Sequence, residues 1–148
     1  MALVQDAVKI AISQLHKTEN PLGSNWGEPV KSYLKSVGID FPASWCMAYV
    51  YWCMQEAYAE GNPLFRTGGV LNQWNKTPLA ARGKTPEVGD VFIMDFGKGL
   101  GHTGFVYEII GEHIMTIEGN SNDEGSREGY EVCIRSRKIS TCKGFIKI

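Results

Sequence analysis

The stretch FPASWCMAYVYWCMQEAYAEG, residues 41–61, combines a long apolar run with a cysteine near its beginning. From about Trp45 to Glu60 its apolar residues recur at helical spacing, and Gly61 follows where a helix would end. These apolar residues cover a wide face, which is typical of a central and mostly buried helix. The stretch therefore predicts the central helix of the fold, with Cys46 in its first turn.

The other predicted elements are segregated along the chain. Further helices are predicted at about residues 3–16, within 27–38 and at 69–75. The second half of the chain predicts strands at 91–96, 102–110, 113–120, 130–137 and 143–148. Because helices and strands do not alternate, the pattern favours an α+β fold over a series of βαβ units.

Length and charge limit the classes of function. A chain of 148 residues has the length of about one domain, and no repeat or linker divides it, so we expect a single domain over residues 1–148. The formal net charge of −1 provides no basic field of the kind that marks a nucleic-acid-binding protein. We see no signal peptide and no membrane span, and we expect a monomer without a nucleic-acid or membrane partner.

The four cysteines are predicted to be free thiols. Cys46 and Cys53 are seven residues apart on one predicted helix, which separates their Cα atoms by roughly 10 Å and prevents a disulfide bond between them. Cys133 and Cys142 flank a segment that can form a hairpin turn, so a bridge between them is geometrically feasible. Without a signal peptide, free thiols are the preferred interpretation.

Cys46 is the candidate nucleophile. Ser44 is the predicted N-cap, which places Cys46 in the first helical turn, where unpaired backbone N–H groups and the helix dipole favour a negative charge. Such a position favours the reactive thiolate over the thiol. The alternative is that Cys46 is one more small core residue, and this interpretation is retained for Cys53 inside the helix.

A cysteine nucleophile needs a base, and His102 is the best placed of the three histidines. His16 and His113 have the surroundings of ordinary surface histidines, whereas His102 follows the flexible GKGLG segment and opens an apolar strand. In the next predicted strand, Glu118 and Asn120 share a face, and hairpin pairing brings His102 near them. Either side chain can fix the imidazole tautomer and leave the other ring nitrogen for the cysteine. Alternatively, Glu118 is a solvated strand residue and Asn120 a turn former.

Four segments together resemble a known family. In chain order they are SWCMAYVYWCMQEA (44–57), PEVGDVFIMD (86–95), GHTGFVYEI (101–109) and IEGNSND (117–123). They resemble the CHAP amidase and endopeptidase group of the NlpC/P60 superfamily, the papain-like peptidoglycan hydrolases of phage endolysins and bacterial wall enzymes. The resemblance covers about the whole chain in element order. It implies a papain-like α+β fold in which N-terminal helices pack on a C-terminal antiparallel sheet.

The resemblance also implies a role for each candidate residue. Cys46 would be the nucleophile and His102 the general base and then the general acid, while the backbone N–H of Cys46 would help to hold the oxyanion. Glu118 would orient His102, and Asn120 is the competing candidate because the family pattern allows either residue type.

Three further expectations concern binding. Many CHAP domains carry a calcium loop of D-x-D-x-x-G type before the cysteine, but the matching stretch KTENPLGSNWGE lacks paired aspartates, so we predict no metal and no cofactor. Trp45 and Trp74 are candidates to line a substrate groove, whereas Trp52 is expected in the core. The loop NDEGSREG (122–129) either binds substrate or is merely solvated.

The leading hypothesis is a cysteine hydrolase that cleaves an amide bond in peptidoglycan through a thioester, either between muramoyl and L-alanine or within the stem peptide or cross-bridge. The alternative is a catalytically silent CHAP-like module that binds wall fragments or a partner protein, although such a module has no physical need for Cys46, His102 and Glu118 together. A zinc or redox site ranks low because no C-x-x-C pair or His/Cys cluster exists.

The expected place of action is the cell wall. A protein made in the cytoplasm without a signal peptide would reach the wall as a phage lysin or as an effector delivered by a secretion system. An effector would have an immunity protein as a partner.

Overall fold

The computed structural model of the protein describes residues 2–121 and 129–148. Its helices occupy the first half of the chain, where apolar residues recur at helical spacing. They are α1 (Ala2–Ser13), α2 (Val30–Ser36), α3 (Cys46–Tyr58) and α4 (Val70–Lys76), followed by the short 3-10 helices η1 (Leu79–Ala81) and η2 (Ile139–Thr141).

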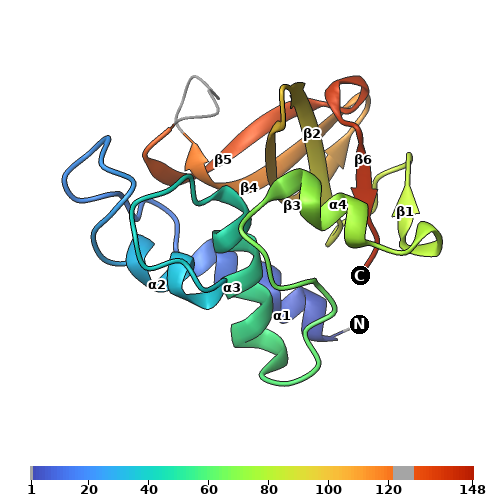
Figure 1. The fold of residues 1–148 in the computed structure, drawn as a ribbon. Coiled ribbons are helices and arrows are strands. Elements are labelled where there is room, and N and C mark those ends of the chain that lie inside the picture. The colour runs from blue at the N-terminus through green and yellow to red at the C-terminus, as the bar shows by residue number, and fades with distance from the viewer. Residues whose placement is uncertain (1, 122–128) are drawn as a thin grey trace.

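The second half of the chain forms one antiparallel sheet. Its strands are β1 (Arg82–Gly83), β2 (Val91–Gly97), β3 (Leu100–Ile110), β4 (His113–Ser121), β5 (Glu131–Lys138) and β6 (Gly144–Ile146). Their order in space is β1-β6-β2-β3-β4-β5. Helices α1, α2 and α3 lie on one side of this sheet (Figure 1), which confirms the predicted α+β arrangement of helices on an antiparallel sheet.

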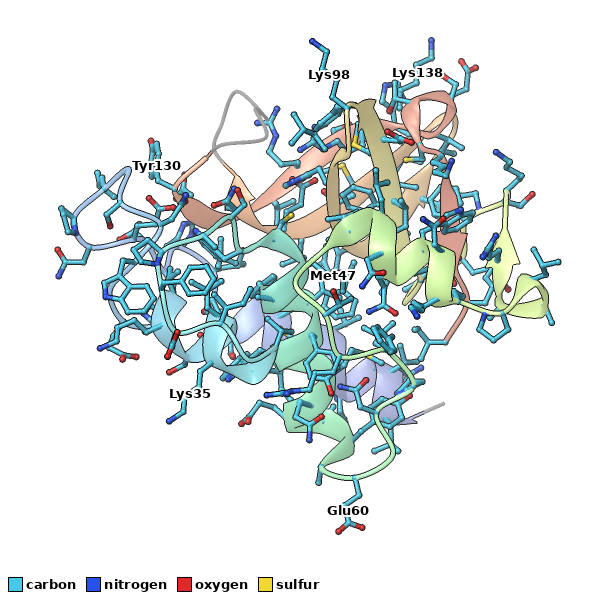
Figure 2. All side chains as sticks on the ribbon, viewed as in Figure 1. Lys35, Met47, Glu60, Lys98, Tyr130 and Lys138 are labelled. Carbon is cyan, nitrogen blue, oxygen red and sulfur yellow. The ribbon has the colours of Figure 1, made fainter. Side chains whose placement is uncertain are left out.

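The main core lies between α3 and the sheet. Phe105 of β3 and Ile117 of β4 pair with each other and are fully buried against the helices. Met47 of α3 is also fully buried and lies between the helix and the sheet (Figure 2). Burial of such side chains contributes about 1.5–3 kcal/mol each. This packing fixes the position of α3, and therefore of its N-terminal residue, relative to the strands.

The first turn of α3 differs from the prediction by one residue. Cys46 lies in the first turn as expected, but it is the first helical residue, because Trp45 occupies the N-cap position in place of Ser44. The carbonyl of Trp45 accepts the first helical bond from Tyr49 N at 2.9 Å. The indole N–H of Trp45 donates to the buried carboxylate of Glu19 at 2.7 Å. This hydrogen bond anchors Trp45 at the helix entrance.

A β-bulge in β3 decides which side chains share a face of the sheet. Between the turn and Glu108 the two strands pair in one register, in which Glu108 lies opposite Met115. On the far side of the bulge Phe105 lies opposite Ile117, so the pairing there is shifted by one residue. Because side chains alternate along a strand, this shift puts His102 and Glu118 on the same face. In the unshifted register they would lie on opposite faces.

The remaining structural expectations concern cysteines and membranes. All four cysteines are free thiols, as predicted. Cys53 is completely buried, and burial raises the pKa of its thiol, which agrees with a core role. Of the helices that the structure describes, none combines the length and the apolar character that a membrane crossing requires.

Candidate active site

Cys46 is brought to the sheet by the close approach of α3 to β4. Cys46 is almost fully buried at the N-terminus of the helix. A Cβ on Gly119 of β4 would lie 2.7 Å from the ring of Trp45 and 2.9 Å from Cβ of Tyr49, so only glycine allows this approach. The helix start therefore lies against the strand that also carries Glu118.

His102 is completely buried in β3 and is held by Glu118. Its Nε2 lies 2.7 Å from Oε1 of Glu118, and its ring is 6.1 Å from the ring of Phe92. An ionised carboxylate can only accept, so Nε2 carries a proton and donates it. In the neutral ring the lone pair is therefore on Nδ1, and this nitrogen is available to the thiol of Cys46.

His102 interacts with Cys46 as well as with Glu118. No described residue meets the geometry of a hydrogen bond to Nδ1, but Cys46 is close enough to affect the charge of the ring. Burial by itself lowers the pKa of His102, and the interactions with Cys46 and Glu118 outweigh burial, so that the pKa is raised to about 9. At neutral pH the imidazolium is therefore favoured, and its charge stabilises a thiolate beside it.

Glu118 is a buried anion that accepts hydrogen bonds on both carboxylate oxygens. Oε1 accepts from His102 Nε2 and from Arg137 Nη2, both at 2.7 Å. Oε2 accepts from Thr116 Oγ1 at 2.6 Å and from Arg137 Nε at 2.8 Å. Burial by itself raises the pKa of Glu118, but the bonds from Arg137 and His102 outweigh it and hold this pKa well below its usual value. The carboxylate therefore stays ionised.

Two candidates for orienting His102 are distinguished by geometry. Glu118 is in direct contact with Nε2 of the ring. Asn120 is buried at the end of β4, where its backbone is in the left-handed region with φ of 56°. The partner of Nε2 in the structure is thus the carboxylate of Glu118 and not the amide of Asn120.

Trp45 and Trp74, the two tryptophans expected to line a substrate groove, are both buried. Trp45 is completely buried, with its indole bonded to Glu19. Trp74 is only 9% exposed, and its ring lies 5.1 Å from the guanidinium of Arg82 and packs closely on Gly144. Both rings are used for packing, so neither presents a free face to a ligand.

Arg137 and Thr116 contact Glu118 but were not among the candidates from sequence. Residues of β5 alternate, and Cys133 pairs with Glu118 while Arg137 pairs with Ile114. The alternation does place Arg137 on the same face as Cys133. However, Arg137 reaches Glu118 diagonally across the sheet, and the sequence pattern does not specify the direction of a long side chain.

Two expectations about binding concern the region around this site. The loop at 122–129 lies outside the described residues except for Gly129. Within residues 2–121 and 129–148, no group of three or more His, Cys, Asp or Glu side chains is arranged to hold a metal ion.

Gly104 makes room for Glu118, and its replacement gives a testable prediction. A Cβ at this position would lie 2.6 Å from the carbonyl oxygen of Ile117 and 2.9 Å from Cγ of Glu118. We expect Gly104→Ala to force β3 and β4 apart and to lower the free energy of unfolding by about 1–3 kcal/mol. Urea denaturation measures this change.

Gly83→Ala is the matched control for this substitution. Gly83 is also a strand glycine, but its nearest contact is the flexible side chain of Lys147. The control should therefore cost less than Gly104→Ala. Equal losses in the two variants would show that the space beside Glu118 is not specially restricted.

Comparisons with known proteins were consistent with this geometry. The family model of the CHAP domain matches residues 38–120, which is more than half of the chain. Two solved structures share the fold: a wild-type endolysin, LysIME-EF1, with a TM-score of 0.62 and 19% identity, and Ly7917, with a TM-score of 0.57 and 14% identity. Each covers 97% of this chain, which spans 63% and 61% of their respective lengths. A search of curated proteins found no match.

Proposed function

Because this chain belongs to the CHAP domain family, we propose that it is a peptidoglycan hydrolase that cleaves an amide bond through a thioester on Cys46. The observation that carries the proposal is the buried contact of His102 with ionised Glu118, beside a cysteine at a helix N-terminus. The fold shared with an endolysin supports the wall as the place of action.

The first half of the proposed reaction forms the thioester. The thiolate of Cys46 attacks the carbonyl carbon of the scissile amide, and the electron pair of the C=O bond moves to oxygen. The backbone N–H of Cys46 helps to hold this oxyanion. When the intermediate collapses, the C–N bond breaks and the amine leaves with the proton from Nδ1 of His102.

The second half regenerates the enzyme. Water attacks the thioester carbon and gives a proton to Nδ1 of His102, so that the carboxylate product leaves and Cys46 is free again. Throughout both halves, Glu118 keeps Nε2 of His102 protonated and the ring in one orientation. The buried setting strengthens these charge interactions because little water screens them.

The proposal covers residues 1–148 as one catalytic domain, with the cell wall as its substrate. Two bonds are candidates for cleavage, the amide between muramoyl and L-alanine and an amide of the stem peptide or cross-bridge. The new termini differ between them, because only an amidase releases the amine of L-alanine from the glycan.

The test is digestion of purified peptidoglycan sacculi, with soluble products identified by mass spectrometry. We expect the parent protein to release products with new amine and carboxylate termini, and Cys46→Ala to release none above background. Cys53→Ala is the matched control because Cys53 is a buried thiol of the same helix that lies within the core. It should retain the parent product pattern.

Other results would change the proposal. Equal products from the parent and from Cys46→Ala would remove Cys46 from the mechanism. No products from the folded parent protein across several wall types would favour a silent module that binds wall fragments or a partner.

A further inference from the structure

Arg137 on β5 donates two hydrogen bonds to Glu118, the carboxylate that holds His102. We propose that Arg137 is a positioning residue that fixes both the orientation and the negative charge of Glu118, so that Glu118 can hold His102 beside Cys46. Its effect on catalysis rests on the proposed cysteine hydrolase function, but its effect on the thiol does not require a wall substrate.

The hydrogen bonds from Arg137 and its neighbours fix the orientation of the Glu118 carboxylate. Arg137 donates from Nε to one oxygen of Glu118 and from Nη2 to the other, at 2.8 and 2.7 Å. Each oxygen also accepts one further bond, from His102 or from Thr116. A carboxylate has about four lone-pair positions, and these four donors fill them. Rotation of Glu118 would break at least one of these bonds, so its Oε1 stays directed at His102.

The contact with both oxygens of Glu118 explains why position 137 is an arginine and not a lysine. A guanidinium presents parallel N–H groups that match a carboxylate, whereas an ammonium group is a point charge. The side chain of Arg137 is only 11% exposed and that of Glu118 is fully buried, so water does not replace a lost bond easily. Arginine is thus suited to hold both oxygens of Glu118 from its position opposite Ile114.

The second effect of Arg137 is on charge. Among the described residues, the ionisable groups near Glu118 are His102 from β3, with Cys46 beyond it on α3, and Arg137 from β5, with Cys133 and Cys142 near the guanidinium. Arg135 lies on the same face of β5, opposite Thr116. Both arginines are permanent cations, and Arg137 is the one that donates hydrogen bonds to Glu118. It balances the charge of Glu118, so that the imidazolium of His102 remains to balance a thiolate on Cys46.

Loss of Arg137 has a defined consequence. Burial favours the protonated form of Glu118, and without the guanidinium this carboxylate should take up a proton at a higher pH. A neutral Glu118 no longer stabilises the imidazolium of His102. Cys46 would then have less positive charge beside it, and its thiol should react more slowly.

The experiment measures the rate of alkylation of Cys46 by iodoacetamide against pH, with the modified peptide quantified by mass spectrometry. We expect the acid limb of this profile to move to higher pH by about one unit in Arg137→Gln, which is about a tenfold lower rate on that limb. Arg137→Lys should lie between Arg137→Gln and the parent, because the charge is kept while the paired bonds are lost. Thermal unfolding is recorded for each variant to verify that it is folded.

Lys138→Gln is the matched control. Lys138 is the next residue of β5 and points away from the protein (Figure 2), so the control removes one positive charge from the same strand without touching Glu118. Its profile should coincide with that of the parent. A parental profile in folded Arg137→Gln, even with a lower melting temperature, would overturn the proposal and leave Arg137 a purely structural role.

Two further outcomes are informative: one concerns a variant that does not fold, and the other separates the role of Arg137 from the proposed hydrolase function. If Arg137→Gln does not fold, Arg137→Lys decides the matter, because a parental profile in that variant also overturns the proposal. If the parent protein digests no peptidoglycan but the acid limb still moves as expected, the wall hydrolase proposal fails and the role of Arg137 is supported.

Discussion

His102→Ala should reduce peptidoglycan hydrolysis by about 10⁴-fold or more, because it removes both the proton acceptor and the proton donor of the proposed reaction. The ring of His102 is completely buried between Cys46 and Glu118, so no other described side chain is placed to take over its Nδ1. Without the imidazolium, a thiolate on Cys46 also loses its neighbouring positive charge.

The rate of release of new amine termini from sacculi measures this loss. His113→Ala is the matched control, since His113 is exposed at the start of β4 and makes no part of the proposed site. The control should retain the activity of the parent. Activity of His102→Ala within tenfold of the parent would show that the buried imidazole does not carry the proton transfers.

Glu118→Gln should produce the second largest effect, because it keeps the shape of the side chain and removes its charge. We expect activity to fall by about 10²–10⁴-fold, as the amide no longer enforces the protonation of His102 at Nε2. The substitution also leaves the largely buried guanidinium of Arg137 without its anion. Breaking a buried ion pair from one side costs about 3–5 kcal/mol of unfolding free energy.

The pH dependence of this stability loss has a definite sign. The pKa of Glu118 is lower in the folded protein than in the unfolded chain, so its ionisation stabilises the fold above the unfolded pKa of about 4.3. That stabilisation is lost as the pH falls toward the folded pKa. The difference in stability between the parent and Glu118→Gln should therefore be full between about pH 5 and about pH 6.5 and decrease below about pH 4.

Urea denaturation at a series of pH values, together with the sacculus assay, measures both effects. Glu108→Gln is the matched control because Glu108 is an exposed glutamate of β3. It should change the unfolding free energy by less than about 0.5 kcal/mol. A stability loss in Glu118→Gln that stays constant from pH 7 to pH 3 would contradict an ionised, paired Glu118.

Several features of this protein could be predicted from local sequence patterns. Apolar spacing identified the central helix and placed Cys46 in its first turn. The hairpin pattern placed Glu118 on the strand next to that of His102. The predicted segregation of helices and strands was also confirmed. These features depend on residues that are close in the chain, and such patterns are present in the sequence itself.

The surroundings of Trp45 were harder to predict, because they depend on a residue far away in the chain. Trp45 was expected to face a groove, but its indole is bonded to Glu19, which lies 26 residues earlier in the chain. Trp45 also occupies the helix N-cap position, where Ser44 was expected. Propensity alone favoured the serine, and a buried long-range hydrogen bond outweighed it.

By itself, the sequence determined the elements, the alternation of their side chains and the types of residue available for cysteine chemistry. Only the tertiary structure decided how those residues meet. The bulge in β3 shifts the register by one residue and so brings His102 to the face of Glu118, and the arginine of β5 reaches the same carboxylate diagonally across the sheet. Both depend on strand pairing and on the direction of long side chains, which are fixed by packing between distant segments and leave no periodic pattern in the sequence.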